Sequence, residues 1–346
     1  MVSLSAKQCG VRFVLGFAVS AGIAHAQLAP TQTREERRDA ARQNANAVEW
    51  LERIVKSARE LPYTGVFVHA TPDGTTTSRI THVLDARGVE NEKIESLEGP
   101  MMEIVRRDEE MICYKPDQKT VRIDRRASGR FFPSLISGNP RDVAENYRVK
   151  VGGVERVAGF DCQWITLEPK DALRYMQALC ADVNTGLLLR ARLYNERNQV
   201  IEQFTFTQLD VSRNAPRQSL RSRFERAIGW KRDEAVQAPT KDRDVDTGWN
   251  VSNLPNGFRK VMELLRPMPG RREPVAQLVF SDGVSHVSLF AEQAAEGSRV
   301  SATGGSSDHP TTFASRTVAD YQITVMGEVP IGAVQQIADG VTRRTK

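Results

Sequence analysis

The chain has 346 residues, a length that suggests two domains of ordinary size. Its composition, 40% hydrophobic and 26% charged, is that of a globular protein and excludes wholesale disorder. The formal net charge of +5 is mild and is compatible with acidic peptides or anionic lipids as partners.

The first 26 residues predict a secretory signal. Lys7 and Arg12 precede the apolar run FVLGFAVSAGIA, which is too short to span a bilayer comfortably. The AHA at its end is a cleavage site of the A-x-A type, so we expect removal after Ala26. The alternative is an uncleaved anchor. Export predicts no nucleic-acid partner and permits disulfide bonds.

The next residues predict a leader and then a helix. Residues 27–43 are polar and charged, which is typical of a flexible leader. Asn46 and Glu49 fit a capping box for the amphipathic helix that follows, and Pro62 ends this helix.

Strand patterns begin at Thr64 and continue to residue 212, as about ten short strands joined by tight turns. Connections this short join antiparallel neighbours, and an antiparallel sheet this large tends to curl. We therefore expect residues 44–212 to form an unclosed antiparallel β-barrel with the leading helix packed in it.

The apolar side chains of these strands either fill a core or line a cavity for an apolar ligand. Two of the candidates lie in a long stretch, residues 127–147, that reads as a loop with a short helix. The candidate cavity residues are Val66, Val68, Ile104, Phe131, Phe132, Trp164, Phe204 and Phe206.

Three cysteines follow the signal: Cys113, Cys162 and Cys180. An odd number permits at most one internal disulfide. Cys162 is expected to pair either with Cys180, across a hairpin that turns near Asp171, or with Cys113. The third interpretation is that all three are small buried apolar residues.

Residues 213–247 are rich in charged residues and predict a linker. Arg221, Arg223, Arg226 and Trp230 are its candidate partner-binding residues, and the alternative is a solvated basic face. Residues 248–346 then predict a smaller α+β domain. Asp282-Gly283 reads there as a two-residue hairpin turn, and PIGAVQQIADGV as a helix that starts near Pro330.

No catalytic, phosphate-binding or metal-binding motif is found in the sequence. His69 and His82 are the only weak candidates for a two-histidine metal site, on the assumption that they face each other across a hairpin. We therefore expect a binding protein that is not an enzyme and that carries no cofactor.

Several stretches resemble the MucB/RseB family across essentially the whole mature chain. They include WLERIVKSARELPYTGVFVH, MICYKPDQKTVRID, GWNVSNLPNGF and the segment that runs from RVAGFDCQWITLEPK to EQFTFTQL. The resemblance implies an N-terminal domain like the lipoprotein carriers LolA and LolB, followed by a smaller C-terminal domain.

The resemblance also implies a function in the periplasm, as a negative regulator of the envelope-stress sigma-E response. Family members bind the periplasmic part of a membrane-spanning anti-sigma factor of the RseA/MucA kind and shield it from proteolysis. Lipopolysaccharide or another acylated ligand is expected to release it. We expect the C-terminal domain and the linker to form much of the partner surface, and a homo-oligomer is compatible with this interpretation. The alternative function is a periplasmic lipid or lipoprotein carrier of the LolA type.

Overall fold

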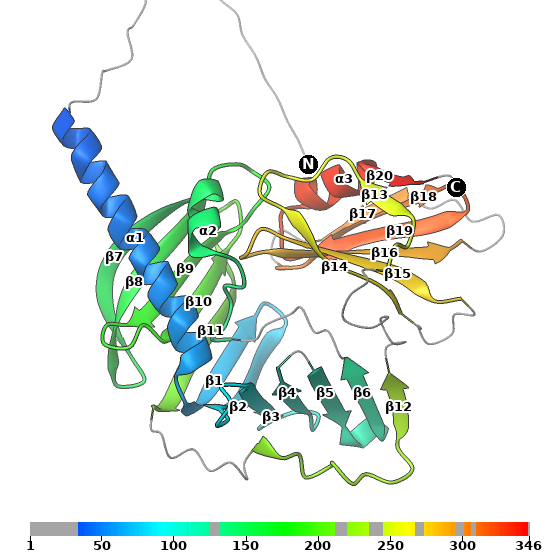
Figure 1. Cartoon of the computed structure of the whole chain (residues 1–346), viewed down its shortest axis with the longest axis horizontal. Helices are drawn as coiled ribbons and strands as arrows, with labels where there is room; N and C mark the ends of the chain where they lie inside the picture. The colour runs from blue at the N-terminus through cyan, green and yellow to red at the C-terminus, as the bar shows by residue number, and fades with distance from the viewer. Residues whose placement is uncertain are drawn as a thin grey trace, which may run out of the picture. The chain divides into compact units, whose positions relative to one another are not determined.

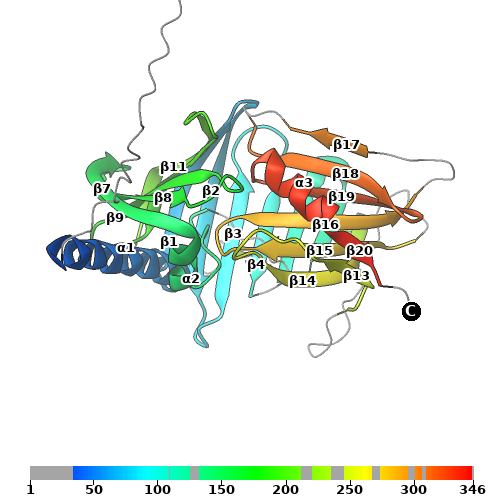
Figure 2. The ribbon, with the colours of Figure 1, turned by 90° about the horizontal axis from the view of Figure 1, so that it is seen from above.

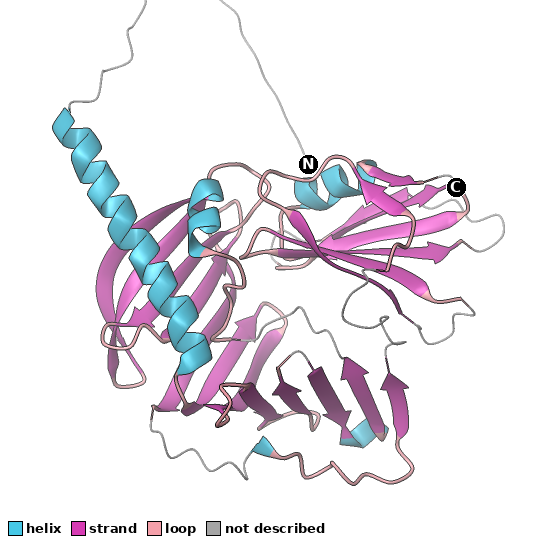
Figure 3. Ribbon diagram, in the orientation of Figure 1, coloured by secondary structure: helices cyan, strands magenta, loops and turns pink. Residues whose placement is uncertain are grey.

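The structure is a computed structural model, and it describes residues 34–108, 110–124, 132–211, 220–234, 245–266, 273–294, 301–305 and 309–344. Residues 41–346 form one compact unit, and strands predominate in it (Figure 3). The expected signal and residues 27–33 of the expected leader lie outside the described residues. In the part of the chain that the structure describes, we find no helix with the length and apolar character needed to span a bilayer.

The chain's long first helix is α1, Arg34–Glu60 (Figure 1). Ala47, Leu51, Ile54 and Ala58 recur at helical spacing and are buried, at 0–3% exposure. The capping box predicts a first helical residue at Ala47, and the helix begins about thirteen residues earlier, at Arg34. Residues 34–43 are therefore helical, not a flexible leader, because alanine, arginine, glutamate and glutamine continue the helix without a glycine or proline.

A 12-stranded sheet forms most of the N-terminal domain. Its order, β12-β6-β5-β4-β3-β2-β1-β11-β10-β9-β8-β7, leaves β7 and β12 as edges, so the barrel is unclosed, as predicted. Among the described residues, its strands, with the intervening 3-10 and α-helices, are β1 Tyr63–Thr71, β2 Gly74–Leu84, β3 Glu90–Ser96, β4 Glu103–Arg107, β5 Glu110–Lys115, η1 Pro116–Gln118, β6 Thr120–Asp124, α2 Pro140–Asn146, β7 Tyr147–Val157, β8 Phe160–Pro169, β9 Met176–Asp182, β10 Leu188–Tyr194, β11 Val200–Asp210 and β12 Lys231–Glu234.

The strand β12 corrects the linker prediction. It pairs with β6 in parallel, with Lys231 opposite Thr120, so part of residues 213–247 belongs to the sheet. Two antiparallel strands can share a tight turn, whereas this parallel partner arrives after a long connection. Residues 220–234, which we call the docked segment, therefore cover and extend one end of the sheet.

The C-terminal domain has its own sheet, in the order β14-β15-β16-β19-β18-β17, and a two-stranded pair β13-β20. Helix α3 covers one face of the larger sheet (Figure 2). The described elements are β13 Trp249–Val251, β14 Arg259–Arg266, β15 Val275–Ser281, β16 His286–Gln293, β17 Ser301–Gly304, β18 Thr312–Val318, β19 Tyr321–Gly327, α3 Ile331–Asp339 and β20 Val341–Arg343. The smaller α+β domain is therefore confirmed.

One predicted turn of this domain is wrong. Ser281 pairs with His286, so the hairpin of β15 and β16 closes through four residues, 282–285, rather than through Asp282-Gly283 alone. The Asp282 carboxylate accepts hydrogen bonds from the amides of Val284 and Ser285, at 3.0 and 2.8 Å, which stabilises the longer loop.

Candidate functional site

Four phenylalanine rings pack together inside the N-terminal sheet, and we call them the ring cluster. Phe67 on β1 lies opposite Phe206 on β11 in the strand register, and Phe204 is two residues away on the same face. Phe132 completes the cluster, with its ring centroid 4.9 Å from Phe206 and 5.5 Å from both Phe67 and Phe204. Phe132 is 1% exposed, so the rings form a filled core in this structure.

Only three of the predicted cavity residues, Phe132, Phe204 and Phe206, lie in the ring cluster. Val66 and Val68 are on the opposite face of β1, because successive side chains of a strand alternate and Phe67 occupies the inner face. Ile104 is buried elsewhere in the same core, and Phe131 lies outside the described residues. Phe67 was missed, although the alternation of Tyr63, Gly65 and Phe67 could have identified the inner face.

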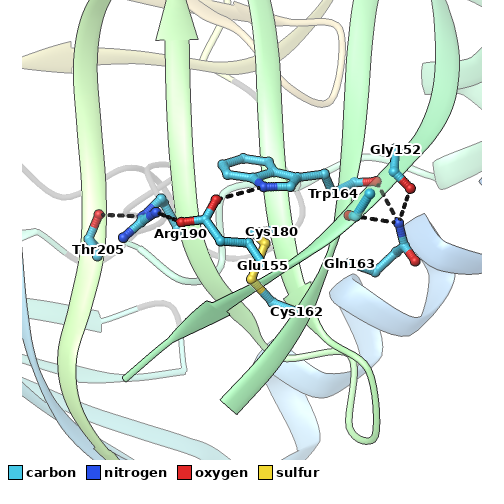
Figure 4. The surroundings of a disulfide bond; sticks show 9 residues. Gly152, Glu155, Cys162, Gln163, Trp164, Cys180, Arg190 and Thr205 are labelled. Carbon is cyan, nitrogen blue, oxygen red and sulfur yellow. Dashed lines mark hydrogen bonds and ion pairs between the residues drawn. A yellow bond between two sulfur atoms is a disulfide. The ribbon is translucent and has the colours of Figure 1, made fainter. Parts of the chain in front are cut away.

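Trp164 takes part in a polar network at the disulfide (Figure 4). Its indole Nε1 donates to Glu155 Oε2 at 2.9 Å, and Glu155 also pairs with Arg190. The guanidinium of Arg192 lies over the Trp164 ring. Trp164 is partly buried and packs against the N-terminal core, but it is not one of the four rings of the ring cluster.

The structure pairs Cys162 with Cys180, one of the two pairings left open by the sequence. The two residues lie on the neighbouring strands β8 and β9, with Cα atoms 5.3 Å apart, and neither is exposed. Cys113 on β5 is a free thiol, so the Cys113–Cys162 alternative is wrong. Burial raises the pKa of the Cys113 thiol, which opposes its ionisation.

His69 and His82 do not face each other. His69 stacks on Phe204, with ring centroids 4.2 Å apart, and bonds to Glu202 at 2.7 Å. His82 stacks on Tyr63 and bonds through Nδ1 to the Leu61 carbonyl. The two-histidine interpretation is therefore wrong, and the described residues contain no cluster of three or more His, Cys, Asp or Glu that could hold a metal ion.

The predicted partner-binding residues lie in the docked segment, and two of them attach it to the sheet. Arg223 Nε pairs with Glu103 at 2.6 Å, and Trp230 packs in an apolar cluster with Phe224 and Tyr114. Burial raises the pKa of Glu103, but hydrogen bonds from Ser222 and Arg223 outweigh it and hold this pKa below its usual value. The side chains of Arg221 and Arg226 are exposed.

Buried polar contacts join the two domains at the loop 282–285, and we call this place the domain junction. Asp282 Oδ2 accepts a hydrogen bond from Arg174 Nε at 2.7 Å and one from the Tyr147 hydroxyl at 3.0 Å. The side chains of Arg174 and Asp282 are both 0% exposed. Burial and the Asp282 charge raise the pKa of Tyr147 well above its ordinary value, so it remains a donor.

Backbone contacts complete the domain junction. The amides of Ser137 and Gly138 donate to the Gly283 carbonyl at 2.9 and 3.2 Å. A Cβ placed on Gly138 would lie 2.6 Å from Gly283 Cα, so only glycine allows this approach. Val284 packs into the N-terminal core. A second buried ion pair, Arg266 with Asp124 at 2.9 Å, also links the domains.

Sequence reasoning missed the domain junction because its residues are separated by more than a hundred positions. Asp282 stands in a turn between two apolar strands, where aspartate is expected for the geometry of the turn. The turn therefore explained its presence, and no second role was predicted for it. Nothing in the sequence around Arg174 or Tyr147 indicates that these two side chains bind Asp282.

Comparison with known proteins matches both domains. The family model for the MucB/RseB N-terminal domain matches residues 46–224, and that for the MucB/RseB C-terminal domain matches residues 243–342. The sigma factor AlgU regulatory protein MucB of Pseudomonas aeruginosa is 30% identical over 305 residues, 86% of this chain and 91% of that protein. The sigma-E factor regulatory protein RseB of Salmonella typhimurium is 26% identical over 301 residues, 85% of this chain and 90% of that protein.

A solved structure shows the same fold. MucB in the complex structure of Pseudomonas aeruginosa MucA/MucB is similar to this chain with a TM-score of 0.68 and 26% identity, over 87% of this chain and 100% of that one. The order of the two domains, the unclosed sheet and the smaller second sheet agree with these matches. The chain belongs to the MucB/RseB family.

Proposed function

We propose that this chain is a periplasmic negative regulator of an envelope-stress sigma factor. It binds the periplasmic part of a membrane-spanning anti-sigma factor and shields that part from proteolysis. A lipopolysaccharide-like acylated ligand releases the anti-sigma factor. The mature chain starts after Ala26, which the sequence of the signal supports.

The observation that carries the proposal is the similarity to MucB as it stands in its complex with MucA. That similarity covers both domains and the whole of that chain, so it does not rest on the N-terminal fold alone. The relatives in Pseudomonas aeruginosa and Salmonella typhimurium are both named as sigma-factor regulatory proteins.

The carrier alternative has less support. The ring cluster fills the space between β1, β11 and the segment at Phe132, so a carrier would have to displace it for every cargo that it takes up. A carrier also has no evident use for a second domain that is tied to the first by a buried ion pair.

The direct test is titration of the mature protein with the periplasmic segment of the anti-sigma factor from the same organism, followed by calorimetry. Saturable 1:1 binding is expected, together with protection of that segment from added protease. The matched control is the same segment in scrambled order. Absence of binding to the native segment would contradict the proposal.

The partner surface can be tested separately in the docked segment. Because Arg221 and Arg226 are exposed, we expect the variant R221A/R226A to fold normally and to bind the anti-sigma segment more weakly. The control R87A/R148A removes two exposed arginines elsewhere on the N-terminal domain. If the two double variants bind the anti-sigma segment with equal affinity, the docked segment is not part of the partner surface.

A further inference from the structure

The segment Phe132–Gly138 contacts both the ring cluster and the domain junction. At its start, Phe132 supplies one ring of the ring cluster. At its end, Ser137 and Gly138 hold the carbonyl of Gly283 at the domain junction. It therefore connects the core of the N-terminal domain with the attachment of the C-terminal domain.

The segment is packed between these two ends. Phe132, Ser134 and Ile136 are at most 7% exposed, and Leu135 packs partly against the same core. Ile136 belongs to the core cluster that also receives Val284 from the loop 282–285. A packed interior has little free space to absorb a displacement, so movement of the Phe132 end has to move the neighbouring residues.

The contact at the other end tolerates almost no movement. Gly138 and Gly283 meet backbone to backbone, where even one added methyl group would collide. Ser137 also reaches the Gly283 carbonyl with its hydroxyl, at 3.4 Å, so all three donors that hold Gly283 belong to this short segment and move with it. A displacement of the segment therefore breaks these hydrogen bonds instead of stretching them.

We propose that the segment Phe132–Gly138 couples the ring cluster to the domain junction. An apolar chain that takes the place of the Phe132 ring withdraws Ser137 and Gly138 from Gly283 and loosens the C-terminal domain. This inference rests on the proposed function for the acyl character of its ligand. The contacts through which the coupling acts all lie among the described residues.

The two states differ in defined contacts, as an allosteric coupling requires. In the first state the Phe132 ring fills the ring cluster and the loop 282–285 is held. In the second state the ligand fills the ring cluster and the loop keeps only its side-chain contacts, through Asp282 and Val284. Since coupling is reciprocal, a change that loosens the loop must also favour the ligand.

The test uses the full mature chain and lauric acid as the apolar probe. Hydrogen exchange is measured by mass spectrometry for peptides that cover residues 132–138 and 282–285, and lauric acid affinity by calorimetry. The variant Gly138→Ala pushes on Gly283 without touching a ring. The matched control is Gly153→Ala, because a Cβ at Gly153 meets nothing within 4 Å.

In the wild-type protein, lauric acid is expected to speed exchange in both peptides. Gly138→Ala should show fast exchange at 282–285 without the probe and should bind lauric acid about tenfold more tightly, while Gly153→Ala matches the wild type. Should Gly138→Ala fail to fold, Phe132→Leu carries the test, since loss of the ring should speed exchange at 282–285.

Equal lauric acid affinity of Gly138→Ala and the wild type would overturn the coupling, and so would a probe effect confined to residues 132–136. Lack of probe binding by every variant would overturn it as well. Anti-sigma binding by the wild-type protein is measured in a separate titration. Its loss with the exchange coupling intact would reject the proposed function alone.

Discussion

Asp282 makes four hydrogen bonds from one side chain. Oδ1 accepts from the amides of Val284 and Ser285, and Oδ2 accepts from Arg174 and the Tyr147 hydroxyl. One carboxylate thus shapes the loop and joins it to the other domain. A buried charge is tolerated only when it is paired and hydrogen-bonded in this way, which makes the residue sensitive to replacement.

The variant Asp282→Asn should lower the free energy of unfolding by about 3 kcal/mol, the lower end for a broken buried ion pair, because Arg174 keeps its second partner, Asp171. The asparagine amide has one oxygen. Either the loop amides of Val284 and Ser285 or the pair Arg174 and Tyr147 therefore lose their hydrogen-bond acceptor. Urea denaturation measures the loss. The control is Glu168→Gln, whose pair with Lys150 is exposed and should contribute less than about 1 kcal/mol. Similar losses in the two variants would contradict the assignment.

His286 lies at the domain junction, and we expect it to make this contact sensitive to acid. It lies beside Ser137, with Nε2 and Oγ 3.3 Å apart. Burial lowers the pKa of His286 below its ordinary value of about 6.5, although the Asp282 carboxylate acts in the opposite direction. The folded protein therefore favours the neutral ring, and its stability is lost as the pH falls below about 6.5 through the folded pKa.

We expect His286→Gln to remove that part of the pH dependence. The free energy of unfolding, measured by urea titration between about pH 7 and about pH 5, should fall less for the variant than for the wild type. The control His309→Gln removes a more exposed histidine, near Asp73. An unchanged slope for His286→Gln would exclude this histidine as the cause.

At the scale of elements, the sequence predicted what local patterns determine. The strands between Thr64 and residue 212, helix α3 and the smaller second domain are found in the structure. Strand β12 was not predicted, because the strand it pairs with, β6, is about a hundred residues earlier in the chain. The inner face of β1 was misassigned because Val66, Phe67 and Val68 are all apolar, so composition does not show which of them points inward.

The disulfide cross-links the neighbouring strands β8 and β9. Removal with Cys162→Ala/Cys180→Ala should lower the free energy of unfolding by about 2–5 kcal/mol, since the unfolded chain is no longer cross-linked. Denaturation with and without reductant measures the effect. The free thiol provides the control, because Cys113→Ala should leave the response to reductant unchanged. A double variant as stable as the wild type would show that the disulfide is dispensable.

At the scale of the whole molecule, two sheets have separate cores and still form one compact unit. Among the contacts that connect them are two buried ion pairs, Asp282–Arg174 and Arg266–Asp124. In such an arrangement, a local change at the domain junction can alter the mobility of the whole C-terminal domain. The sequence could predict two domains but not how they attach, since attachment depends on contacts between distant positions.

Because both ion pairs are buried between the domains, we expect the wild-type protein to unfold in a single transition in scanning calorimetry. The double variant Asp282→Asn/Arg266→Ala should unfold in two, as each core then melts at its own temperature. Glu168→Gln again serves as the control and should keep one transition. Two resolved transitions in the wild type would show that the domains are energetically independent.

The parallel strand β12 bears on whether copies of this protein aggregate through their sheet edges. Unpaired sheet margins invite strands from neighbouring molecules and so promote aggregation. Here the chain covers the margin at β6 with its own backbone. At the opposite margin, the pairing of β7 with β8 shifts register between Val151 and Val154, where two glycines lie. The large described sheet thus offers incoming strands no long, regular template, which opposes aggregation of the folded protein.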